Sequence, residues 1–100
     1  MKSIDKLTNG DYIAFGFNYH GGEPDEIIVD NITEIYKEKG EIREVLVHFL
    51  YGHHSLSEFV KRENILAIGD TKGKDVIEGW TGTYEILNQK KINKILAKRK

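Results

Sequence analysis

Short stretches in which apolar residues occupy every second position constrain the fold of this chain more than any other feature. The clearest stretch follows Asp11 and contains Ile13, Phe15, Phe17 and Tyr19. Successive residues of a β-strand point to opposite faces, so this period of two places the four side chains on one buried face. Turn-forming segments with glycine separate such stretches, which is typical of several short antiparallel strands.

The same pattern predicts further strands along the chain. One runs from Glu26 to about Tyr36, and its apolar residues change phase near Asp30, which indicates a change of register. The strand from Ile42 to Leu50 is apolar on both faces, so we expect it at a central or covered position. A polar turn is expected at 51–55. Shorter strands are expected at 56–60, 65–68 and 80–86, with a single helical turn at 61–64.

The last part of the chain has helical spacing. After Asn88, whose side chain is suited to cap a helix, apolar residues recur at Ile92, Ile95 and Leu96 among lysines. This spacing predicts a C-terminal amphipathic helix whose narrow apolar stripe docks on the sheet.

Strand phase also predicts part of the core. Four side chains share the inward phase of their strands: Phe15, Val47, Phe49 and Ile65. Five or six short strands in one small chain are typical of a curved antiparallel sheet or barrel. We therefore predict a mainly β fold, an SH3-like small antiparallel β-barrel with a C-terminal amphipathic helix.

Charge is distributed unevenly over the 100 residues. Residues 1–89 carry sixteen Asp and Glu against nine Lys and Arg, a net charge of −7, whereas residues 90–100 carry six cations and no acid. We expect an SH3-like barrel domain at 1–89 and a basic helix or tail at 90–100. The acidic domain would repel a phosphate backbone, but the tail could contact one.

Composition excludes several classes of protein. The absence of cysteine excludes a disulfide scaffold, a cysteine-ligated metal and a thiol nucleophile. The longest apolar runs are about four or five residues, far below the ~20 needed to span a bilayer. Since Met1–Asp5 also lacks the apolar core of a signal peptide, we expect a cytoplasmic domain that does not contact membranes.

One long segment resembles a known family. Residues Val45–Val60 read VLVHFLYGHHSLSEFV and are followed by Asn64 and Ile65. This segment resembles the core of chromo-barrel and Tudor-like domains, SH3-like barrels in which a valine-histidine-tyrosine strand end precedes an aromatic turn and a glutamate-tryptophan-valine strand. The start at Leu7–Ile13 is similar to the glycine-aspartate opening of their first strand. The resemblance covers about residues 7–68 and implies an SH3-like barrel.

Chromo-barrel domains hold methyl-lysine in a cage of aromatic rings, whose faces attract a cation. In this resemblance, Phe49 occupies a cage tyrosine position and Phe59 the closing tryptophan position. Two other aromatic positions fall on Gly52, with Tyr51 displaced by one, and on Leu56. Aromatics from other strands that could complete a cage are Tyr19, Tyr51 and Trp80.

Neither a metal site nor catalytic residues are expected. The histidines lie on a loop, a strand and a turn, and the neighbouring His53 and His54 should diverge, so a closed zinc site with His20 or His48 lacks convergent ligands. Acidic residues are spread along loops and strand exteriors, the serines lack a nucleophile-elbow context, and no phosphate-binding glycine loop occurs. We therefore expect no cofactor and no enzymatic activity.

The sequence favours recognition of a protein partner. Aromatic residues suited to anchor an interface are Tyr51, Phe59, Trp80 and Tyr84. The acidic domain favours a partner with a basic surface. The alternative is a nucleic-acid-binding barrel with contacts from Lys61, Arg62, Lys90, Lys91, Lys94, Lys98 and Arg99. The composition is typical of bacterial or phage accessory proteins, and it leaves the partner and the oligomeric state open.

Overall fold

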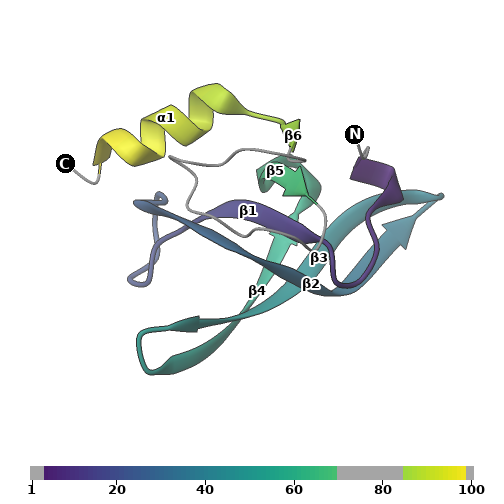
Figure 1. The fold of residues 1–100 in the computed structure, drawn as a ribbon, viewed down its shortest axis with the longest axis horizontal. Helices are drawn as coiled ribbons and strands as arrows, with labels where there is room; N and C mark the ends of the chain where they lie inside the picture. The colour runs from purple at the N-terminus through teal and green to yellow at the C-terminus, as the bar shows by residue number, and fades with distance from the viewer. Residues whose placement is uncertain (1–3, 70–84, 99–100) are drawn as a thin grey trace.

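The computed structural model describes residues 4–69 and 85–98 and is mainly β, as predicted. Six antiparallel strands form one sheet in the order β4-β3-β2-β1-β5-β6, followed by a C-terminal helix (Figure 1). The strands are β1 (Tyr12–Phe17), β2 (Glu26–Glu38), β3 (Glu41–Tyr51), β4 (His54–Lys61), β5 (Ile65–Gly69) and β6 (Glu85–Ile86). Helix α1 spans Gln89–Lys98, and single turns of 3-10 helix span Ile4–Lys6 and Arg62–Asn64. Within the described residues the sheet is not closed, because β4 and β6 lie at its two ends.

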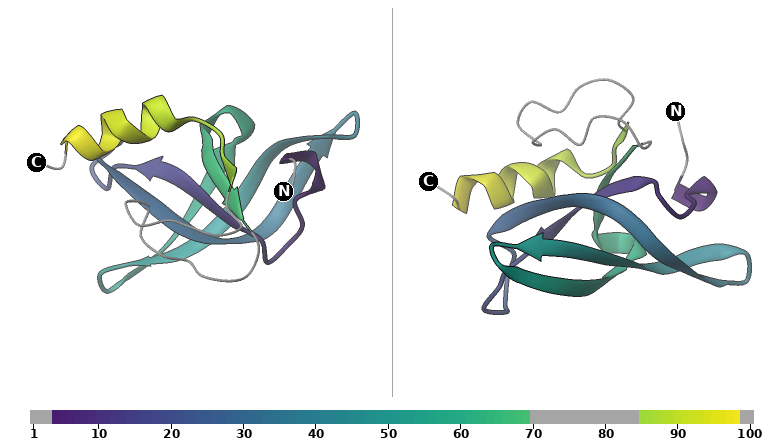
Figure 2. Two further views of the ribbon diagram at one scale, coloured as in Figure 1. Left: turned by 45° about the horizontal axis from the view of Figure 1, so that its top comes forward. Right: turned by 60° about the horizontal axis from the view of Figure 1, so that its bottom comes forward.

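Strand β2 belongs to both halves of the sheet. Its residues 26–31 pair with β1, and from Ile32, opposite Val47, it pairs with β3. The phase change predicted near Asp30 therefore coincides with the exchange of partner strands. This exchange lets the two halves curve around one core, as the two views of Figure 2 show.

Two tight turns connect β2, β3 and β4. Both residues of the β2–β3 turn at 39–40 have positive φ, as a two-residue hairpin turn of this kind requires. Between β3 and β4, only Gly52, with a φ of 62°, and His53 separate the strands. The polar turn expected at 51–55 is thus shorter than predicted, because strand pairing continues to the minimal two-residue connection.

The larger apolar cluster lies between the two halves of the sheet. It contains the four residues predicted for the core, each at most 4% exposed, which confirms the strand phases. Phe49 meets Phe15 and Phe17 edge to face, with ring centroids 5.7 and 5.1 Å apart, a favourable aromatic geometry. The other buried members are Leu7, Ile13, Ile32, Ile42, Val45, Val60 and Ile68.

Helix α1 forms a second apolar cluster on the opposite face of β1 and β5 (Figure 2). Ile92 and Ile95, two of the predicted stripe residues, are buried there with Ala14, Leu66 and Ala67. Strand β1 is therefore buried on both faces. Its large side chains face the sheet core, and its small ones face the helix.

Two local features hold α1 in this position. Asn88 caps the helix as predicted, since its Oδ1 accepts a hydrogen bond from the Lys91 N–H at 3.0 Å. Gly16 permits a close approach, because a Cβ at this position would lie 2.7 Å from Cβ of Pro24 and 3.0 Å from Cδ1 of Ile95. Any larger residue at Gly16 would push the helix or the β1–β2 loop outward.

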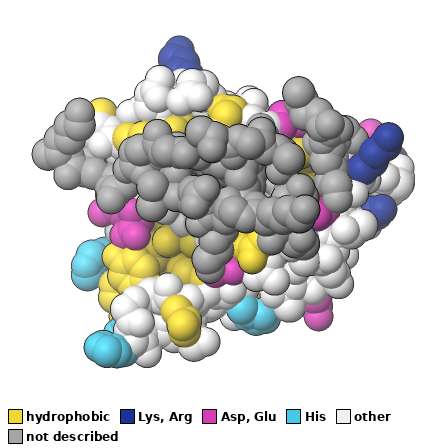
Figure 3. Space-filling view, viewed as in Figure 1, with side chains coloured by type: hydrophobic (Ala, Val, Ile, Leu, Met, Phe, Trp, Pro, Cys, Tyr) yellow, Lys and Arg dark blue, Asp and Glu magenta, His cyan; other side chains and the backbone are white. Residues whose placement is uncertain are grey.

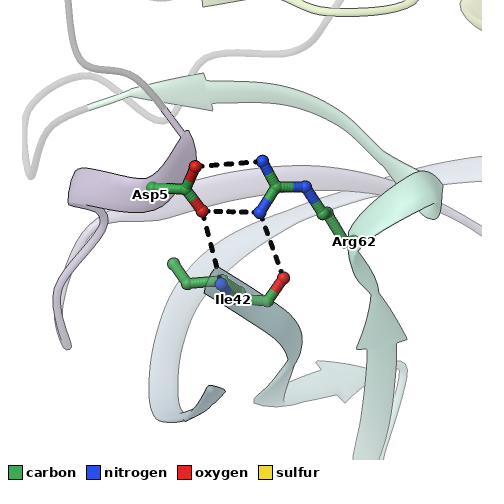
Figure 4. Close-up of polar contacts among 3 residues, drawn as sticks. All are labelled: Asp5, Ile42 and Arg62. Carbon is green, nitrogen blue, oxygen red and sulfur yellow. Dashed lines mark hydrogen bonds and ion pairs between the residues drawn. The ribbon is translucent and has the colours of Figure 1, made fainter. Parts of the chain in front are cut away.

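A polar cluster holds the N-terminal segment against the sheet (Figure 4). Arg62 donates hydrogen bonds to both carboxylate oxygens of Asp5, at 2.5 and 3.1 Å, and to the carbonyl oxygen of Ile42 at 3.2 Å. The Ile42 N–H donates to Asp5 Oδ1 at 3.3 Å. The Arg62 hydrogen bonds, followed by the one from Ile42, hold the pKa of Asp5 below its ordinary value of 3.8. This cluster joins the first 3-10 turn to β3 and to the turn after β4.

Some sequence predictions concern residues that the structure does not describe. Trp80, Tyr84 and Arg99 lie outside the described residues. Of the strand expected at 80–86, Glu85–Ile86 is described as β6, which pairs with β5. Across residues 4–69 and 85–98, we find no helix with the length and apolar character needed to cross a membrane.

Candidate functional site

A slot of about 570 Å³ lies between the end of β1 and strand β4. Strand β1 pairs with β5 only as far as Phe15, opposite Ile65, but continues to Phe17. Strand β4 pairs with β3 and is the end strand of the sheet. The slot therefore marks the place where the sheet remains open.

The slot has a mixed lining, in which polar groups provide more of the surface than apolar ones. Phe15 and Val60 are buried at its base, and Phe59 on its border is 56% exposed. Among the described residues that line it, Glu58 is the one acid and Lys91 the one base. A concave site with a mixed lining can bury apolar parts of a ligand while its polar groups select and orient the ligand.

Stacked aromatic rings border the slot at Tyr19. The rings of Tyr19 and Tyr51 are nearly parallel, at 7°, with centroids 5.1 Å apart, and the His54 ring lies 5.7 Å from Tyr19. The Tyr51 hydroxyl donates a hydrogen bond to Oε2 of Glu26 at 2.6 Å, which raises the pKa of Tyr51. Phe17 meets the edge of the Tyr51 ring. We call Tyr19, Tyr51 and His54 the aromatic stack.

Figure 3 shows the surroundings of this stack. Hydrophobic and histidine side chains gather at the lower left of the view, where Figure 1 places the β1–β2 loop and the β3–β4 turn. An exposed aromatic surface beside a concave site is typical of interaction surfaces.

The aromatic positions carried over from the family resemblance lie in different environments. Phe49 is 4% exposed and packs in the core. Phe59 lies on the outer face of β4, where its ring centroid is 5.9 Å from that of Tyr36. Tyr51 belongs to the aromatic stack, in which the faces of Tyr19 and Tyr51 are directed at each other. Tyr51 and Phe59 therefore lie near the slot as separate anchors.

The basic residues predicted to contact nucleic acid lie in two places. The Arg62 guanidinium is bound to Asp5 and Ile42, and the neighbouring Lys61 is exposed at the end of β4. The four described lysines of α1 line a second depression of about 410 Å³ together with Glu23, Pro24, Asn88 and Ile95: Lys90, Lys91, Lys94 and Lys98. Lys98 forms an ion pair with Glu23 at 2.7 Å, which lowers the pKa of the Glu23 carboxyl group.

The histidines do not converge in the described structure. Residues 4–69 and 85–98 contain no group of three or more His, Asp or Glu side chains placed to hold a metal ion. His48 lies on the outer face of β3, where Nδ1 contacts the Ser57 hydroxyl of β4. Both side chains of this pair are exposed on the surface of the sheet.

Glu58 is a residue of this site that the sequence did not single out for binding a partner. Glu58 lies between Leu56 and Val60 in the inward phase of β4. Leu56 and Glu58 are half-buried, and Val60 is buried. A carboxylate in the inward phase of a strand is a recognisable signal, because inward-pointing charges recur on edge strands. Its meaning depended on which strand stood opposite, and only the tertiary structure gives that information.

No protein-family model matches the chain, no curated protein matches it in sequence, and no solved structure matches its fold.

Proposed function

We propose that this chain is a non-enzymatic, SH3-like recognition module that binds an extended segment of a protein partner along β4 and in the slot. The observation that carries the proposal is the slot, which has both polar and apolar groups in its lining and lies directly beside the eight-residue end strand β4. Extended segments commonly bind to proteins by adding a strand to such an edge.

The strand connections support the SH3-like assignment. The strand order places β1 between β2 and β5, β2 takes part in both halves, and a 3-10 turn joins β4 to β5. In small barrels of this type, function is carried by sites grafted onto the fold. The open side between β1 and β4 would then be the binding side.

The backbone of β4 supports strand addition. Every second residue of an antiparallel edge strand points its N–H and C=O groups away from its partner strand. On β4 these groups face away from β3, and none of the described strands pairs with them. Main-chain groups would supply affinity, and the slot would select side chains of the bound segment.

The chemistry of the surface indicates the partner. Residues 1–89 carry a net charge of −7, so long-range attraction favours a basic segment. Tyr51 and Phe59 flank the slot and are residue types that commonly anchor interfaces. We therefore propose a basic, extended protein segment as the ligand and the cytoplasm as the place of action.

A defined peptide tests this function. The probe is a capped seven-residue peptide of alternating threonine and valine with a central lysine, titrated into isotope-labelled protein while amide shifts are recorded. We expect the largest shifts on β4 and around the slot. Two control peptides carry N-methyl groups on one or the other set of alternate amides, and at least one should lose binding. No shift on β4, or full affinity of both methylated peptides, would refute strand addition.

Nucleic-acid binding is the second candidate, favoured by the four lysines that share one depression on α1. Deletion of the helix is an unsuitable test, since Ile92 and Ile95 belong to a buried cluster. The better variant is Lys90→Gln with Lys94→Gln, compared with Lys6→Gln and Lys37→Gln. We expect only non-specific affinity for a single-stranded oligonucleotide at physiological salt, on the order of 10⁻⁴–10⁻⁶ M. Sub-micromolar binding lost only in the helix variant would favour this second function instead.

A further inference from the structure

We infer that the slot receives a lysine or arginine side chain of the bound segment, with Glu58 as its counter-ion. This inference rests on the proposed function, because it assigns a side-chain specificity to the same site. The position of the Glu58 carboxylate and the residues around it support the assignment.

The first argument is the direction of the Glu58 side chain. Burial alternates along β4, where Leu56 and Glu58 are half-buried, Val60 is buried, and the residues between them are exposed. Because alternate residues of a strand share a face, Glu58 points to the concave side with Leu56 and Val60. Its position in the lining of the slot agrees with this direction.

The second argument is that no described group neutralises this carboxylate. In the part of the chain that the structure describes, neither an ion pair nor a hydrogen bond joins Glu58 to another side chain. The one base of the slot, Lys91, instead donates from Nζ to Oδ1 of Asn64 at 3.1 Å. A partly desolvated charge without a partner is unfavourable. A cation that entered the slot would therefore gain an ion pair at little cost to existing contacts.

The third argument is the apolar surface that surrounds the carboxylate. Phe15, Phe17 and Val60 line the same slot, and the long methylene stem of lysine or arginine can pack on such surface while its charged end reaches an acid. This arrangement differs from a cage of aromatic rings, because the cation is held by a carboxylate and its N–H donors are required. Loss of those donors should therefore weaken binding.

Peptides that differ at one side chain test the inference. The seven-residue probe is prepared with lysine, arginine, norleucine, glutamate or trimethyl-lysine at its centre, and dissociation constants are measured at two salt concentrations. We expect the lysine and arginine peptides to bind about fivefold more tightly than the norleucine peptide, because a partly exposed ion pair contributes a free energy of this size. Salt should reduce that preference. Trimethyl-lysine should bind no more tightly than lysine.

Variants of one residue complete the test. Glu58→Gln should bind all the peptides with the affinity that wild type has for the norleucine peptide, and Glu58→Lys should prefer the glutamate peptide. The matched control is Glu63→Gln, which removes an exposed charge outside the slot and should keep the preference for lysine.

The outcomes separate the two proposals. If lysine and norleucine peptides bind equally to β4, or if Glu58→Gln retains the preference, the counter-ion assignment is wrong and strand addition stands. If trimethyl-lysine binds more tightly than lysine, aromatic rings rather than Glu58 hold the cation. If none of the peptides binds, the proposed function itself is wrong.

Discussion

The two halves of the sheet share β2 and one core, but their outer faces differ. On the half formed by β1 and β5, α1 buries the outer face, and Ala14 and Ala67 are fully covered. On the half formed by β3 and β4, no described element covers the outer face, and Leu50 and Phe59 remain 75% and 56% exposed. Apolar side chains on the first half are thus covered by the helix, whereas large apolar side chains on the second half remain open to solvent.

This difference indicates a division of roles between the halves. Both faces of β1 carry buried apolar side chains, and the burial of apolar surface on each face contributes to stability. Large exposed apolar side chains contribute little to the stability of the isolated chain and are typical of interaction surfaces. Substitutions on the two halves should therefore affect different properties.

The largest expected effect compares two phenylalanines. Phe49→Ala should reduce the free energy of unfolding by about 3–5 kcal/mol, because it empties a buried site against two other rings. Phe59→Ala, on the open face, should change it by less than about 0.5 kcal/mol. Urea denaturation measures both. Similar losses for the two variants would contradict the division between covered and open faces.

A medium effect is expected at the contact between sheet and helix. Gly16→Ala should cost about 1–3 kcal/mol of stability, as overpacking does, because the new Cβ would lie 2.7 Å from Cβ of Pro24. The same change at an unobstructed site would be neutral or stabilising. Combining it with Pro24→Gly should recover part of the loss in thermal denaturation. A stable Gly16→Ala single variant would mean that the helix approaches less closely than described.

The smallest effect concerns the Asp5–Arg62 pair and its pH dependence. Because folding lowers the pKa of Asp5, the stability that this group contributes is present above its ordinary value of 3.8 and is lost as the pH falls through the lower folded value. Asp5→Asn should therefore destabilise the protein at pH 7, and its difference from wild type should shrink in acid. Unfolding midpoints measured from pH 7 to pH 2 test this. Asp25→Asn, an exposed acid, serves as the control, and an equal pH response in both variants would contradict the role of the pair.

Much of the fold could be predicted from local sequence pattern. The alternation around Phe15 and Phe49 identified the core, and the spacing of Ile92 and Ile95 identified the helix, because periods of two and 3.6 reflect burial directly. The phase change near Asp30, which predicted a change of register, coincides with the point where β2 exchanges partner strands. The predicted closure of the barrel is not seen among the described strands. Closure depends on whether β1 and β4 meet, and the local pattern carries no information about that.

The site was less predictable because its residues meet only through the tertiary fold. Phe17 and Glu58 line one slot from strands far apart in the sequence, and Asp5 meets Arg62 across a similar separation. Tyr51 and Phe59 were identified as interface residues from their type alone, and whether they bind a partner remains a prediction. Spacing in one sequence carries no information about such long-range neighbours.

The strand order also has a consequence for the path by which the chain folds. Strands β2, β3 and β4 follow one another through two-residue turns, and β1 pairs with β2 across the longer loop at 18–25. The pairing of β1 with β5 is non-local, because Phe15 meets Ile65 only after closure of a loop of about fifty residues. Closing a long loop costs entropy before any contact forms, which delays non-local pairing. We therefore expect the β2–β3–β4 meander to form the folding nucleus. Val47→Ala should slow refolding, and Ile68→Val should chiefly accelerate unfolding, in a comparison of φ-values.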